Sequence, residues 1–100
     1  MSVEYSSGIA EGWIFTEEER NIFNERTNYD FEADFIFPDA YYGEGDSIFG
    51  QWILKNPNVG TAVNLISMKS NLNISEWITR LEKGGIVPTM PQTFLINQVH

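Results

Sequence analysis

The chain has 100 residues, no cysteine and 42% hydrophobic residues, and its 14 carboxylates against six lysines and arginines give a formal net charge of −8. This length suits one domain with one modest core, and the absence of cysteine excludes disulfides, thiolate zinc sites and cysteine nucleophiles. The negative charge argues against direct binding to nucleic acid or anionic membranes, because phosphate contacts require lysine and arginine.

The carboxylates are concentrated in the first half of the chain. Residues 1–50 hold twelve of them beside two arginines, a formal charge of −10, whereas residues 51–100 carry a formal charge of +2. Fourteen aromatic residues are more than a disordered acidic tail carries, so the charge should lie on a folded surface. Without a signal-peptide pattern or a membrane-span pattern in the sequence, we expect a cytoplasmic protein.

A short helix is expected after Thr16. Thr16 and Glu19 have the spacing of a capping box, and the glutamates that follow Thr16 suit the positive end of a helix dipole. Ile22 and Phe23 are its only large apolar residues, so most of the helix should be exposed to solvent.

Residues 30–37 alternate between acidic and apolar side chains, which predicts a half-buried strand. Its phenylalanines would lie in the core. On the exposed side, Asp30, Glu32 and Asp34 would form a row with ~6.6 Å between neighbours. Pro38 should end this strand, and residues 38–46 should form a loop.

The second half predicts further strands and one clear helix. Residues 47–54 read as a strand, and residues 56–60 as a turn. Residues 61–68 fit a strand or a helix, and we favour a strand paired with 47–54. Asn73 is the expected N-cap of a helix that ends at the glycine pair 84–85, and residues 93–96 can form a last strand.

These elements predict an α+β fold: a small single domain over residues 1–100, with about four mostly antiparallel strands and two short helices. The spacing does not determine the order of the strands. We expect three tryptophans in the core: Trp13, Trp52 and Trp77.

The sequence offers little for catalysis. His100 is the only histidine and lies at the chain end, which does not suit a serine–histidine–aspartate arrangement. The glycines at 43 and 45 do not continue into a phosphate-loop pattern, and no cofactor motif is present. We therefore expect a protein that is not an enzyme. A carboxylate metal-dependent enzyme remains a less favoured hypothesis, because its ligands would have to gather in a cleft.

The main hypothesis is a binding protein that docks its acidic surface on a basic site of a nucleic-acid-handling protein and inhibits it. Carboxylates at ~6 to 7 Å intervals are spaced like the phosphates of a nucleic-acid strand. In size and charge the chain resembles the acidic inhibitors found among phage counter-defence and toxin-immunity proteins. The expected partner-binding residues are Glu17, Glu18, Asp30, Glu32, Asp34, Asp39, Tyr41, Tyr42, Glu44 and Asp46.

Two alternatives explain the same pattern. The row of carboxylates could be the solvated side of an outer strand, where charge prevents unwanted sheet pairing. The nearly uncharged residues 84–99 could instead add a strand to a neighbouring subunit, which would make the chain a structural or assembly protein that forms homo-oligomers.

Overall fold

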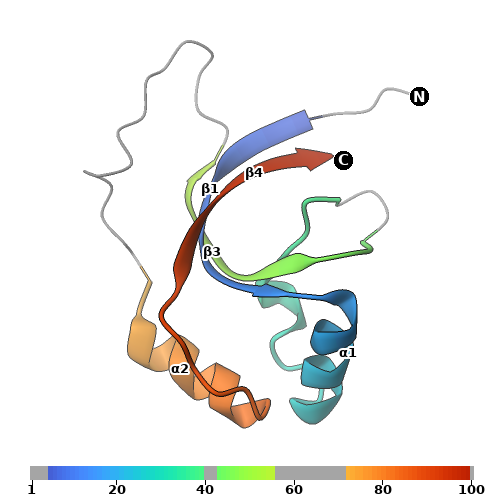
Figure 1. The fold of residues 1–100 in the computed structure, drawn as a ribbon, viewed down its shortest axis with the longest axis vertical. Coiled ribbons are helices and arrows are strands. Elements are labelled where there is room, and N and C mark those ends of the chain that lie inside the picture. Colours follow the sequence, from blue (N-terminus) through green and yellow to red (C-terminus); the bar gives the residue numbers. More distant parts are fainter. Residues whose placement is uncertain (1–4, 40–42, 56–71, 100) are drawn as a thin grey trace.

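The computed structural model describes residues 5–39, 43–55 and 72–99. They form β1 (Tyr5–Phe15), α1 (Glu17–Arg26), a 3-10 helix (Glu32–Asp34), β2 (Phe35–Ile36), β3 (Ser47–Lys55), α2 (Ile74–Lys83) and β4 (Gln92–Val99) (Figure 1). The strands make one antiparallel sheet in the order β2-β3-β1-β4. The predicted α+β class, with four antiparallel strands and two helices, is confirmed. Within the described ranges, no helix combines the length and the hydrophobicity that a membrane crossing requires.

The sheet is strongly curled, as the bent paths of β1 and β4 show in Figure 1. Gly12 of β1 lies directly opposite Gly50 of β3. A Cβ on Gly12 would collide with the carbonyl oxygen of Phe49, and a Cβ on Gly50 with that of Glu11. The two backbones therefore approach more closely than any side chain allows, and this glycine pair permits the bend.

The curl brings the two outer strands of the sheet toward each other across its concave face. Gln98 of β4 donates a hydrogen bond of 2.8 Å from Nε2 to the carbonyl oxygen of Phe37, which follows β2. Ile36 of β2 and Ile96 of β4 belong to one buried cluster, together with Ala10 and Ile48. The sheet is thus a partly closed barrel with a small apolar interior.

The larger core lies on the opposite face of the sheet, where both helices pack. Phe49 of β3 is fully buried at its centre, with ring centroids 5.0 Å from Phe23 of α1 and 4.9 Å from Trp77 of α2. These rings meet edge to face, a geometry that aromatic quadrupoles favour. The buried cluster contains Trp13, Phe15, Phe23, Phe35, Phe49, Leu72, Trp77 and Leu81.

Both helices begin as their sequences predict, and α2 also ends at the predicted glycine pair. Thr16 caps α1 in a complete capping box, and the Asn73 side chain accepts from the Glu76 amide at the start of α2. At the end of α2, the Ile86 amide donates to Leu81 and the Gly85 amide to Glu82, while Gly85 has φ +76°. This is a Schellman motif, which requires a residue such as glycine in the left-handed region.

The predicted strand over residues 30–37 is wrong, because only Phe35 and Ile36 belong to a strand. The preceding residues continue the end of α1 as turns: the Tyr29 amide donates to Asn24, and the Asp34 amide donates to Phe31 within the 3-10 helix. These local hydrogen bonds replace those of a sheet ladder, and the bend lets the Phe31 ring pack near Phe23.

The central strand β1 was not predicted. Its sequence, YSSGIAEGWIF, interrupts the apolar alternation with two glycines and Glu11, so no strand period is visible. Trp13 and Trp77 are buried as expected, whereas Trp52 is only partly buried. The uncertain segment 61–68 lies outside the described residues. The predicted strand over 47–54 is confirmed, and the last strand is longer than predicted.

Candidate protein-binding surface

Helix α1 presents one acidic, fully solvated side. Glu17, Glu18 and Glu25 are exposed there, and with Asn21 and Ile22 they line a shallow hollow of about 470 Å³. Residues 18, 22 and 25 follow the helical spacing that places side chains on one face. The helix therefore fixes three carboxylates around Ile22, whose exposure is 42%.

A buried arginine connects this helix to the loop before β3. Arg20 donates from Nη1 to the carbonyl oxygen of Gly45 at 2.7 Å and to Oγ of Ser47 at 3.1 Å. Its guanidinium carbon also lies 4.8 Å from the centre of the Phe37 ring. Because Arg20 is only 5% exposed, its positive charge is inside the protein, while the loop that it holds lies against α1.

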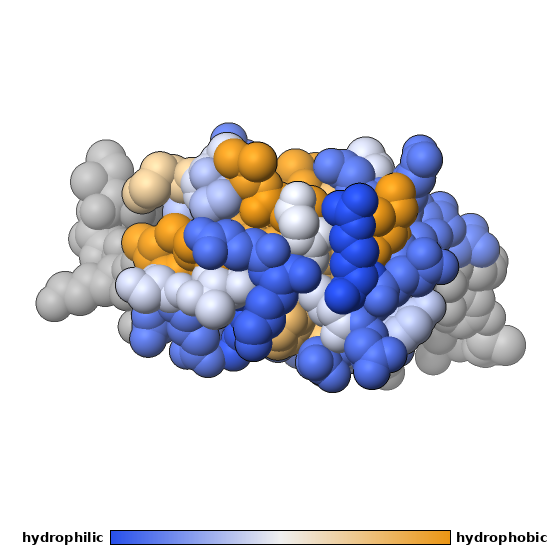
Figure 2. All heavy atoms as spheres, turned by 90° about the horizontal axis from the view of Figure 1, so that it is seen from below, coloured by the Kyte–Doolittle hydropathy of each residue, from blue (hydrophilic) through white to orange (hydrophobic). Residues whose placement is uncertain are grey.

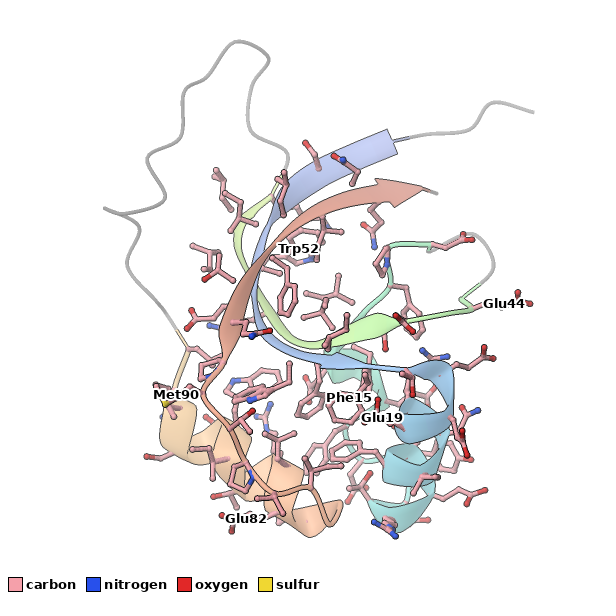
Figure 3. The ribbon with its side chains drawn as sticks, in the orientation of Figure 1. Phe15, Glu19, Glu44, Trp52, Glu82 and Met90 are labelled. Carbon is pink, nitrogen blue, oxygen red and sulfur yellow. The ribbon has the colours of Figure 1, made fainter. Side chains whose placement is uncertain are left out.

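Two further carboxylates belong to that loop. Glu44 and Asp46 flank Gly45 and are exposed. In Figure 3, Glu44 and Glu19 lie on the side of the molecule that carries α1, whereas Glu82 lies on the side of α2. The Glu19 carboxylate accepts the Thr16 amide in the capping box and is therefore partly engaged. We define the acidic surface as Glu17, Glu18, Glu25, Glu44 and Asp46.

The other predicted carboxylates lie beyond the opposite end of α1. Asp34 accepts from Arg80 at 3.2 Å, and Arg80 also donates to Glu76 at 2.6 Å. Asp30 lines a separate hollow with residues that include Arg26 and Lys83. These carboxylates have cations near them and are not arranged as a row along a strand, so that part of the predicted surface geometry is wrong.

The remaining predicted positions are less informative. Glu32 is exposed in the 3-10 helix, and Asp39 is half-buried after β2. Tyr41 and Tyr42 lie outside the described residues, so their role as anchors stays a prediction.

Sequence reasoning missed the contribution of Arg20. The buried residues Arg20, Phe23, Asn24 and Thr27 follow the i, i+3, i+4, i+7 spacing of a core-facing helix stripe. Because three of the four are polar, a search for hydrophobic residues overlooks the stripe. The helical spacing of these four residues was the sequence signal that could have identified Arg20 as buried.

The rest of the helix-bearing face is mixed in character. Figure 2 shows mostly hydrophilic side chains, with hydrophobic groups between them. Exposed apolar residues near α2 include Ile74 at its start and, after its end, Val87 and Met90, which are 84% and 72% exposed. Met90 lies beside α2 in Figure 3.

In the described part of the chain, no three carboxylate or histidine side chains are placed to hold a metal ion. Comparisons with protein-family models, with curated protein sequences and with solved structures found no match.

Proposed function

We propose that this protein is a binding module that docks its acidic surface on the basic, nucleic-acid-binding site of a partner protein and blocks it. The observation that carries the proposal is the Arg20–Gly45 hydrogen bond, which joins the loop that bears Glu44 and Asp46 to the helix that bears Glu17 and Glu18. The arginine that joins the two segments is buried and contributes no exposed charge.

Carboxylates fixed on a helix can attract a basic surface without reproducing the spacing of a phosphate backbone. Glu18 and Glu25 are seven residues apart on α1, which corresponds to roughly 10 Å along the helix axis. Such charges would steer a basic partner and make association fast and sensitive to salt. Ile22, exposed between them, offers an apolar contact that excludes water from the centre of the interface.

Competition with nucleic acid tests the proposal. The chain is immobilised, incubated with cell lysate at low salt, and eluted at high salt, and each captured protein is purified and assayed for DNA and RNA binding. We expect the captured protein to release its nucleic acid when the free chain is added. Capture of a protein that binds the chain and nucleic acid simultaneously would contradict the proposal.

Assembly through β4 is the second candidate. β4 is the last strand of the sheet, its residues Gln92–Val99 carry no charge, and Leu95 is 77% exposed. Uncharged outer strands are the usual templates for strand addition between subunits.

Sedimentation velocity distinguishes the two candidates. If β4 assembles subunits, the chain sediments as an oligomer and Leu95→Lys converts it to a monomer. A wild-type chain that is monomeric at high protein concentration would remove this candidate and leave the binding module.

A further inference from the structure

Strand β3 is far longer than the strand that covers its outer side. β1 pairs with β3 from Ser47 to Lys55, whereas β2 pairs only with Ile48 and Phe49. Each strand directs about half of its backbone N–H and C=O groups toward each neighbour. Among the described residues, no strand pairs with the outer edge of β3 from Gly50 to Lys55, which we name the β3 edge.

A hollow of about 390 Å³ lies at the β3 edge. Phe35 and Gln51 line it from the side of the sheet that faces the helices, and Ile36, Trp52 and Gln98 line it from the concave side. Successive strand residues point to opposite faces, so a hollow lined from both faces lies beyond the edge of the sheet rather than above it.

The 3-10 helix before β2 creates this space. Continued straight, the chain before Phe35 would pair with β3 beyond Phe49, but residues 32–34 turn away, and Ala33 becomes part of the wall. The hollow therefore has the position of a missing extension of β2.

The charges around the hollow indicate what could fill it. Glu32, next to Ala33, is exposed, and its carboxylate makes no hydrogen bond or ion pair within the described structure. Glu11 lies directly across from Gln51 in β1, and its Oε2 is buried without a hydrogen-bond partner. At the other end of β3, Lys55 lies 5.6 Å from the Trp52 ring. An exposed carboxylate without an ion-pair partner among the described residues thus lies next to the wall of the hollow.

We propose that the β3 edge binds an extended, basic segment of a partner protein as an added strand. Backbone hydrogen bonds to β3 would hold the segment, apolar side chains would enter the hollow beside Trp52, and a lysine or arginine would lie near Glu32. A second copy of the chain fits less well, because each copy has a net charge of −8. The β3 edge does not overlap the acidic surface, so this inference does not depend on the proposed function.

The probe is a synthetic peptide, acetyl-TIRVRIT-amide, titrated into the 15N-labelled full chain and followed by NMR. We expect the largest shift changes and slowed amide exchange on β3 from Gly50 to Lys55. The acidic twin, acetyl-TIEVEIT-amide, should bind at least ~10-fold more weakly. A twin of the basic peptide with proline at its centre, which cannot complete the hydrogen bonds, should also bind poorly.

Variants separate this site from the others. Glu32→Lys should weaken binding of the basic peptide at least ~5-fold, whereas Glu82→Lys, the same charge change on α2, and Glu44→Lys on the acidic surface should have smaller effects. Shift changes confined to α1 or to β4, equal binding of both charged peptides, or peptide-independent self-association through β3 would each overturn the proposal.

Discussion

Arg20 and Ser47 are joined by a buried hydrogen bond of 3.1 Å, although 27 residues separate them in the sequence. Ser47 is fully buried at the first position of β3, and the same Nη1 of Arg20 reaches the Gly45 carbonyl. A side chain of α1 thus contacts both the acidic loop 43–46 and the first residue of β3. The central claim, that loop and helix act as one surface, depends on this arginine.

Replacing Arg20 should destabilise the fold. Arg20→Ala leaves the Ser47 hydroxyl and the Gly45 carbonyl without their donor and removes the stacking on Phe37, so we expect a loss of about 2–4 kcal/mol. Urea denaturation measures the change. Arg26→Ala, at an exposed position of the same helix, is the control and should cost clearly less. Equal losses for the two variants would contradict the structural role of Arg20.

Adding one methyl group at the glycine pair should also be costly. In Gly50→Ala the new Cβ meets the Glu11 carbonyl and the Gly12 Cα, both of them backbone atoms that cannot move alone. We expect a loss of about 3 kcal/mol or more, measured by thermal and urea unfolding. Gly43→Ala is the control: its Cβ meets open space, and the left-handed φ of +65° should cost only about 1–2 kcal/mol.

Glu11 should be a position where substitution increases stability. Its side chain is 8% exposed, and Oε2 has no hydrogen-bond partner, so the folded chain carries an uncompensated desolvation cost. Glu11→Gln removes the charge and keeps the shape, and we expect a gain of about 1 kcal/mol in the free energy of unfolding. Glu82→Gln, on the exposed side of α2, should change little. A lower stability of Glu11→Gln would show that the carboxylate is well solvated or paired.

The Asp34–Arg80 ion pair should contribute little. Both side chains are partly exposed, at 32% and 23%, and Arg80 retains Glu76 when Asp34 is neutralised. Asp34→Asn should therefore cost less than about 1 kcal/mol and leave partner capture unchanged. If Asp34→Asn lost partner capture while its stability stayed unchanged, Asp34 would have to belong to the binding surface.

Local signals predicted the elements whose structure is determined locally. The caps at Thr16 and Asn73 and the glycine pair after α2 each involve hydrogen bonds within a few residues, and all three were readable. β1 could not be predicted in this way, because the hydrogen-bond partners of its backbone lie in β3 and β4, far along the chain. Its glycines are explained only by the close approach of Gly50.

The acidic alternation of residues 30–37 was misleading for a related reason. The alternation with a period of two residues reflected only the composition of this segment. The path of the chain is set by Phe31 and Phe35, whose rings both contact the core on the helix side across the 3-10 turn. At the candidate site, Glu17 and Glu18 could be identified from the capping pattern alone. The connection between this helix and the loop that bears Glu44 and Asp46 could not be identified, because it depends on the long-range contact of Arg20.

Association kinetics at matched net charge test the central claim most directly. Two variants are compared with the wild type against the captured partner, each with four carboxylates changed to amides so that the formal charge goes from −8 to −4. The surface variant changes Glu17, Glu18, Glu44 and Asp46, and the control variant changes Asp30, Asp34, Glu76 and Glu82.

We expect the association rate constant at low salt to fall at least ~10-fold in the surface variant and to lose most of its salt dependence, while the control variant stays within about threefold of the wild type. Equal reductions in the two variants would show that the partner responds to net charge alone, and would contradict a defined acidic surface on α1 and the loop 43–46.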